Sequence, residues 1–243
     1  IGVTNKSGRT ESNRNIIGFA DLGENEDKNI TQQGGVPKWT TNGSATPHNR
    51  ANTLYESMIT TYVGARDISA ANNILDNSGK FESSMDYEKL QSARLLSSSE
   101  YTLNTSLGYV SLNSTLQTDD ILAVAFEYTY NGQTFQVGEF AADLTDNQQA
   151  IFVKLLKGTT GSPILPTWRL MMRNVYNLGA TTVTKDQFRL DVKYQSDSTG
   201  VYLSYLPENA LKGTTLLKAL NLDRLDDKLN ARSNGQFDYV ERY

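Results

Sequence analysis

The dipeptide Asn131-Gly132, which lies between two apolar segments rich in β-forming residues, constrains the fold of this chain more than any other feature. Asn-Gly favours the two consecutive positive-φ positions of a type I′ turn, and this turn joins antiparallel strands through a two-residue loop. Tyr128 then faces Phe135 across the strand pair. We therefore predict a β-hairpin within residues 119–140, in a register that the turn fixes.

The same register places Glu139 opposite Val124, on a face of the hairpin that is otherwise apolar. Burying an unpaired carboxylate is costly, so we expect Glu139 either to reach solvent at the strand end or to find an arginine, a lysine or backbone donors. Two interpretations stay open. Glu139 is a structural ion-pair or strand-end residue, or it is a buried acid at a functional site.

The composition describes a soluble globular protein. Among the 243 residues, 38% are hydrophobic, which supports a real core. The 23 basic residues against 27 acidic ones leave no basic surface for nucleic acid. The absence of cysteine excludes disulfides, thiolate zinc sites and cysteine nucleophiles, and no apolar run is long enough to span a membrane. Because the chain starts at an isoleucine and ends in an extended segment, we expect a piece of a longer protein.

Hydrophobic periodicity and turn residues predict a mainly β fold with interspersed helices. We predict strands over 16–21, 151–156, 188–194 and 201–206, and either one strand or a bent strand pair around Gly108 over 101–112. We predict helices over 51–60, 86–96, 165–178 and 214–225, and a long loop over 22–50. The order lacks the regular strand–helix rhythm of parallel α/β folds. The prediction is an α+β, antiparallel β-sandwich or jelly-roll-like soluble domain. It spans residues 1–243 as a single domain, or divides into 1–118 and 119–243.

Motifs for catalysis are absent from the sequence. The only histidine, His48, lies in a turn-rich segment where we expect an exposed loop residue, and no G-x-S-x-G sequence accompanies it. No Walker or dinucleotide-binding glycine pattern occurs. With 27 acidic residues, some carboxylates always lie near one another, so proximity alone does not indicate a glycosidase. We predict no enzyme activity and no catalytic residues.

Residues 230–241 have the spacing of an EF-hand calcium loop around the turn residue Gly235. The third ligand position holds Arg232, a cation where an oxygen ligand belongs. The charge count therefore favours a polar turn, with a Ca²⁺ site as the alternative and no other cofactor expected. The candidate ligands would be Asn230, Asn234, Asp238 and Glu241.

Aromatic residues offer one further binding signal. Trp39 lies in the predicted long loop, where an exposed indole could stack on a sugar ring. Trp168 falls on the apolar stripe of the predicted helix 165–178, so we expect it in the core. Trp39 is therefore the candidate ligand-binding residue.

Long consecutive segments of the chain match one family in order. They are NIIGFADLGE near the start, then DYEKLQSARLLSSSEYTLNTSLGYVSLNSTL, DDILAVAFEYTYNGQTFQVGEF, LPTWRLMMRNVYNLGA, DQFRLDVKYQ, VYLSYLPE, LLKALNLDRL and NGQFDYVE. In these segments the chain resembles the SprA (Sov) family, the giant outer-membrane translocon proteins of the Bacteroidetes type 9 secretion system. The resemblance covers most of the chain and is weakest over residues 22–80.

The resemblance implies a role in protein export. Members of the family form a very large β-barrel through which folded cargo leaves the periplasm, and in many relatives they support gliding motility. This chain lacks the alternating lipid-facing segments of about ten residues that a barrel wall requires. We therefore expect a soluble, non-enzymatic structural or gating module associated with the outer membrane, as an extracellular cap over the barrel mouth, with a periplasmic position second.

The same resemblance implies the partners of such a module. They would be the rest of the parent barrel protein, the accessory proteins of the secretion system and, transiently, the secreted cargo. No catalytic residue is carried over. The family tends to have aspartates around the glycine turn, and Asn230, Arg232 and Asn234 depart from that pattern. The alternative function is a carbohydrate-binding or adhesive cell-surface module.

Overall fold

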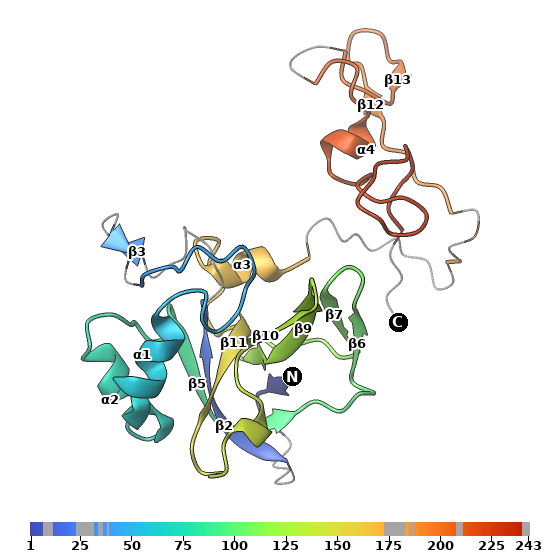
Figure 1. Cartoon of the computed structure of the whole chain (residues 1–243). Helices are drawn as coiled ribbons and strands as arrows, with labels where there is room; N and C mark the ends of the chain where they lie inside the picture. The colour runs from blue at the N-terminus through green and yellow to red at the C-terminus, as the bar shows by residue number, and fades with distance from the viewer. Residues whose placement is uncertain are drawn as a thin grey trace. The chain divides into compact units, whose positions relative to one another are not determined.

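The computed structural model shows a mainly β chain with few helices, and it divides into two compact units. One unit comprises residues 1–98 and 114–172, and the other comprises 99–113 and 173–243 (Figure 1). The chain passes between the units after residues 98, 113 and 172, and these three boundaries differ from the alternative boundary predicted after residue 118. The structure describes residues 1–6, 12–22, 32–33, 36–37, 39–172, 183–184, 186, 188–207 and 211–239.

The first unit contains a small closed β-barrel with the strand order β1-β5-β2-β11-β8. β2 and β11 are parallel, and the other neighbours are antiparallel. The barrel strands are β1 (Gly2–Val3), β2 (Asn13–Phe19), β5 (Tyr87–Leu95), β8 (Leu122–Val124) and β11 (Ile151–Lys157).

The predicted sandwich of two facing sheets is not confirmed, because the sheet closes on itself. The short strand β1 joins its two edges: Gly2 pairs with Leu95 of β5 on one side and with Ala123 of β8 on the other. Full closure removes both edges of the sheet, so no second sheet is needed to cover them.

The interior of this barrel is narrow and admits only a few medium-sized side chains. Its inward-facing core consists of Ile16, Ala93, Ala123, Ile151 and Val153. Gly18 also faces inward. A Cβ atom there would lie 3.1 Å from Cδ1 of Leu155 and 3.6 Å from Cβ of Ala123. Small residues on three strands therefore set the diameter.

A second and larger core lies between the outer face of β2, β5 and β11 and a layer of short helices. These are α1 (Leu54–Thr60), η1 (Val63–Arg66) and α2 (Ala71–Asp76), and Figure 1 shows α1 and α2 on one side of β5 and β2. Aromatic rings dominate the packing, with Phe19 in contact with Phe81, Tyr87 and Phe152. The full set of buried residues is Ile17, Phe19, Leu22, Trp39, Leu54, Met58, Ala65, Ala71, Leu75, Phe81, Tyr87, Ala150 and Phe152.

The remaining elements are short. In the first unit they are β3 (Gln32–Gln33), β4 (Val36–Pro37), β9 (Phe126–Tyr130), β10 (Gln133–Val137), η2 (Ala141–Asp143) and α3 (Pro166–Leu170). In the second unit they are β6 (Tyr101–Asn104), β7 (Tyr109–Leu112), β12 (Tyr194–Gln195), β13 (Tyr202–Leu203) and α4 (Leu216–Ala219). β6 pairs with β7, β9 with β10, and β12 with β13.

The predicted strands 16–21 and 151–156, the predicted helix 51–60 and the strand pair within 101–112 are confirmed by β2, β11, α1 and β6–β7. The predicted helix 86–96 is wrong. This segment is strand β5, which pairs with β2 from Phe19↔Tyr87 to Asn13↔Arg94. The pairing of β5 with β2 and β1 outweighs the helical spacing of its apolar residues, because strand formation depends chiefly on neighbours.

Four other predicted elements are shorter in the structure. α3 ends at Leu170 because Met171 has extended backbone, and residues 173–178 of the predicted helix lie outside the described residues. The predicted strand 188–194 is wrong except for its last residue, and its partner 201–206 is reduced to β13. Of the predicted helix 214–225, only α4 forms, with Thr215 at its N-cap.

We predict that Gly18→Val lowers the free energy of unfolding by about 2 kcal/mol, because the added carbons overpack the barrel against Leu155. Urea denaturation followed by circular dichroism measures this change. The matched control is Gly161→Val, where an added Cβ meets no atom within 4 Å, and it should change stability by less than about 0.5 kcal/mol. Equal losses in the two variants would show that the barrel interior is not tight at this position.

Candidate functional site

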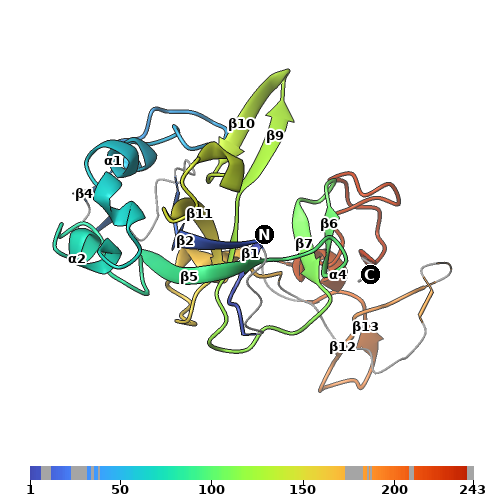
Figure 2. The same ribbon diagram turned by 90° about the horizontal axis from the view of Figure 1, so that it is seen from below.

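The β9–β10 hairpin has the predicted turn and register. Asn131 and Gly132 have φ values of 50° and 77°, as a type I′ turn requires, and Tyr128 pairs with Phe135. Figure 2 shows the hairpin projecting from the barrel. The ladder stops at the pair Phe126↔Val137, so the predicted pair of residues 124 and 139 does not form.

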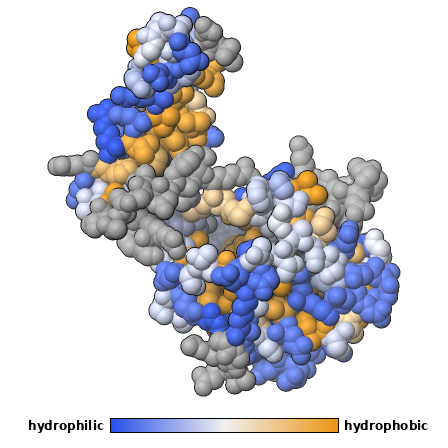
Figure 3. Space-filling model, turned by 180° about the vertical axis from the view of Figure 1, so that it is seen from behind, coloured by the Kyte–Doolittle hydropathy of each residue, from blue (hydrophilic) through white to orange (hydrophobic). Residues whose placement is uncertain are grey.

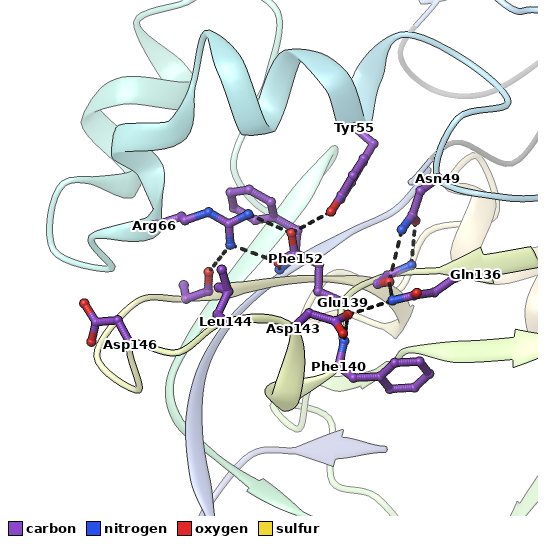
Figure 4. Close-up of polar contacts among 12 residues, drawn as sticks. Asn49, Tyr55, Arg66, Gln136, Glu139, Phe140, Asp143, Leu144, Asp146 and Phe152 are labelled. Carbon is purple, nitrogen blue, oxygen red and sulfur yellow. Dashed lines mark hydrogen bonds and ion pairs between the residues drawn. The ribbon is translucent and has the colours of Figure 1, made fainter.

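The hairpin ends at its base in a buried polar cluster around Glu139 (Figure 4). The Glu139 residue is only 2% exposed, and each of its two carboxylate oxygens accepts two hydrogen bonds. Oε1 accepts from the Tyr55 hydroxyl at 2.9 Å and from Nη2 of Arg66 at 2.7 Å. Oε2 accepts from Nη1 of Arg66 at 2.9 Å and from the Phe152 backbone N–H at 2.8 Å. The expected arginine and backbone partners are thus both present.

Arg66, at the end of η1 in the helical layer, balances the charge of Glu139. Its two terminal nitrogens form a bidentate pair with the carboxylate, and Nη1 also donates to the Ala150 carbonyl at 3.0 Å. The guanidinium carbon lies 4.2 Å from the centre of the Phe152 ring, in cation–π contact. Arg66 comes from η1, so the cluster joins the helical layer to the base of the hairpin.

Tyr55 extends the cluster from helix α1. Burial of its ring, and then the negative charge and hydrogen bond of Glu139, raise the pKa of the Tyr55 hydroxyl well above its ordinary value. The hydroxyl therefore stays protonated and remains a donor across the physiological pH range. Glu139 in turn has no lone pair left for a substrate, since its two oxygens already accept four hydrogen bonds.

A second set of hydrogen bonds holds the residue before Glu139. The Asn49 side chain accepts from the Gly138 N–H at 2.7 Å and donates to the Gly138 carbonyl at 3.1 Å. Gly138 has a φ of 77°, and a Cβ atom there would lie 3.2 Å from Cα of Ala125, the residue between β8 and β9. Only glycine fits both the backbone conformation and the close approach.

The turn after Glu139 is fixed as well. Oδ2 of Asp143 accepts hydrogen bonds from the Gln136 side chain and from the Phe140 N–H, both at 2.8 Å. Gln136 lies on β10 and Asp143 in η2, so this bond joins the hairpin to the segment that follows it. Contacts before and after Glu139 therefore orient the hairpin relative to the barrel.

One face of the hairpin carries a row of aromatic rings in contact with one another. The Tyr128 ring lies 6.1 Å from Phe126 and 5.5 Å from Phe135, and His48 packs against Phe135 at 5.4 Å. The Tyr128 hydroxyl donates to the Pro47 carbonyl at 2.6 Å. His48 is thus half-buried, and the expectation of an exposed loop histidine is wrong. No residue pattern in the sequence indicates the contact between His48 and Phe135.

The two tryptophans are placed opposite to expectation. Trp39 is 6% exposed, with its ring 5.3 Å from Phe81 and beneath the Lys80 ammonium group at 4.7 Å. The expectation that Trp39 is exposed is wrong, because the second core encloses its indole. Trp168 is 38% exposed on the short helix α3, so its predicted place in the core is also wrong.

The calcium-like loop of the second unit is organised around buried Asp223, which the sequence did not single out. Burial opposes ionisation of Asp223, but hydrogen bonds from Ser233, Asn234 and Gly235 outweigh burial and lower its pKa. These donors come from the predicted calcium loop, so the loop presents N–H and O–H groups to a carboxylate.

The candidate calcium ligands do not converge in the part of the loop that the structure describes. Asp238 accepts from the Arg224 and Leu225 N–H groups, while Asn234 and Asn230 donate to Asp227 and Asp226. Glu241 lies outside the described residues. Among the described residues, no group of three or more His, Cys, Asp or Glu side chains could hold a metal ion.

We predict that Glu139→Gln lowers the free energy of unfolding by about 3 kcal/mol, because it leaves the Arg66 charge buried without its counterion. Urea denaturation measures the loss. The double variant Arg66→Met/Glu139→Leu should recover most of it, since no buried charge remains. A single variant as stable as the unmodified chain would mean that water reaches the pair.

We predict that Ca²⁺ at millimolar concentration leaves the melting temperature of the chain unchanged, because the described loop carboxylates already accept backbone hydrogen bonds. Differential scanning fluorimetry with CaCl₂, against MgCl₂ at equal ionic strength, makes the comparison. A rise confined to Ca²⁺, and lost in Asp238→Asn, would instead establish the calcium site.

Within the described residues, no helix combines the length and the apolar character that crossing a bilayer requires. No protein-family model matches the chain, and no curated protein matches it either.

Proposed function

We propose that the chain is a non-enzymatic structural and gating module of a type 9 protein-export translocon, placed as a cell-surface cap over the mouth of the parent barrel. The observation that carries the proposal is the resemblance of consecutive segments, from about residue 86 onward, to the SprA family. A cap works by packing and by controlled movement, so it needs rigid elements and apolar contact surfaces.

The position of the exposed apolar side chains supports this proposal. Two of the resembling segments, DDILAVAFEYTYNGQTFQVGEF and LPTWRLMMRNVYNLGA, carry large apolar residues on the surface of the first unit. A solvent-facing element would normally carry polar groups there, so such residues indicate contact with other protein. They are Phe126, Tyr130, Phe140, Trp168, Leu170, Met171 and Met172.

The second unit also exposes apolar surface, which Figure 3 shows on the upper lobe. The large apolar side chains exposed on this unit include Val201, Tyr202, Tyr205, Leu211 and Leu220. In the described part of the unit, short strands and the short helix α4 provide little regular structure with which to cover them. In the proposed role, these side chains would pack against loops of the parent outer-membrane barrel or against the accessory secretion proteins.

The Glu139 cluster supports a mechanical role for the hairpin. Its carboxylate is fully hydrogen-bonded, and the hairpin base is tied to α1, η1 and β11. A load on the hairpin is therefore transmitted to the barrel and the helical layer together. The proposed gating motion would move the first unit as one body, with the hairpin as its contact element.

We predict that removing this module from the chromosomal copy of the parent gene abolishes secretion of type 9 cargo and stops gliding. A short flexible linker replaces residues 1–243, and the assay compares cargo in the medium with cargo retained in cells. The control is equal abundance of the truncated parent protein in isolated outer membranes. Normal secretion at equal abundance would reject the proposed function.

A further inference from the structure

The outer edge of strand β9 presents backbone groups that have no partner among the described residues. In a hairpin with a two-residue type I′ turn, the pairs Tyr130↔Gln133 and Tyr128↔Phe135 exchange both backbone hydrogen bonds. The intervening residues Glu127 and Thr129 therefore direct their N–H and C=O groups away from β10. Within the described residues, no hydrogen bond is made by these four groups.

The equivalent groups of β10 confirm this orientation. The carbonyl of Gln136, which is paired with Glu127, points outward and accepts a hydrogen bond from the Asn49 N–H at 2.9 Å. The segment around Asn49 thus covers the base of the β10 edge, and β9 has no such cover among the described residues. The two edges of the hairpin differ in this respect.

β9 lacks most of the devices by which proteins protect a free strand edge, and its one charged side chain is Glu127. The strand contains no proline, no lysine and no bulge, and its pairing with β10 runs without interruption. Glu127 and Thr129 are both exposed. An exposed, regular edge is a template for pairing with another extended chain.

The side chains of β9 specify what such a chain would be. Phe126, Tyr128 and Tyr130 lie on one face, where Tyr130 is 56% exposed. Glu127 and Thr129 lie on the other, and Glu127 is the only charged residue between positions 126 and 137. A strand beside β9 would meet an apolar face, a polar face and one negative charge.

We propose that the β9 edge binds an extended peptide segment as a third, antiparallel strand. The segment alternates apolar and polar residues and places a lysine or arginine opposite Glu127. Read from its N-terminus, it has the pattern apolar–polar–apolar–basic–apolar, opposite Tyr130, Thr129, Tyr128, Glu127 and Phe126 in turn. The inference rests on the hairpin alone and holds whether or not the chain belongs to a secretion channel.

A second copy of the chain fits this edge less well. Pairing between two β9 strands would leave Glu127 without a cation in every register, because residues 126–137 contain no lysine or arginine. Some registers would place two Glu127 side chains opposite one another, and like charges directly opposite destabilise a strand pair. The charge therefore favours a basic segment of another protein.

In the test, the capped peptide SVTVKVS is titrated into the ¹⁵N-labelled full chain, and the backbone amide signals are followed by NMR. Binding should slow hydrogen exchange at the amides of Glu127 and Thr129 and leave that of Thr134 unchanged. Thr129→Pro removes an outward N–H and should weaken binding about tenfold. Thr134→Pro makes the same change on the β10 edge and should leave the affinity unaltered.

Charge exchange provides a second measure that does not alter the backbone. Glu127→Lys should weaken binding of SVTVKVS about fivefold, and SVTVEVS should then bind this variant about as well as SVTVKVS binds the unmodified chain. Three results would each overturn the proposal. The peptide does not bind at millimolar concentration, binding is lost in Thr134→Pro, or the affinity is unchanged in both Glu127→Lys and Thr129→Pro. So would dimerisation of the chain through β9 in sedimentation experiments.

Discussion

The buried ion pair between Arg66 and Glu139 is the interaction on which the arrangement of the first unit depends. Arg66 belongs to the helical layer, Glu139 follows the hairpin, and the Phe152 N–H that completes the carboxylate shell belongs to barrel strand β11. One carboxylate thus connects three structural elements. A buried ion pair adds little stability over an apolar pair, but losing one partner is costly. The pair therefore acts mainly to fix which surfaces meet.

The closure of the barrel explains why the hairpin lies outside it. β8 forms part of the closed sheet through Val124, which pairs with Lys154 of β11. Beyond Ala125 the chain leaves the barrel, and the hairpin has no sheet edge there to join because β1 already closes the sheet between β8 and β5. The return path from β10 must then pass close to Ala125, and only Gly138 allows that approach. The buried cluster begins at the next residue, so barrel closure determines where the ion pair forms.

The hairpin could be predicted from adjacent residues. The features that could not be predicted depend on contacts between residues far apart in the sequence. Asn131-Gly132 specified turn and register from adjacent residues alone, and the need of Glu139 for donors followed from its apolar neighbours. Its partner Arg66 lies 73 residues away, and nothing in the spacing indicates that contact. The segment 86–96 was misassigned because β5 owes its conformation to β2 and β1. The burial of Trp39 likewise results from a long-range contact, the packing of its indole against Phe81.

The outer edge of β9 is free among the described residues because the contacts that hold the hairpin reach its other sides. A two-stranded hairpin is at best marginally stable alone, so this one depends on contacts from outside. Asn49 on the β10 edge, Pro47 and His48 on the aromatic face and Glu139 at the base supply those contacts, and all leave the outer edge of β9 open. A strand that pairs there would give the sheet three strands, the number at which a sheet becomes stable in its own right. Binding a partner and stiffening the hairpin would then be one event, and the anchored base would carry that change to the barrel.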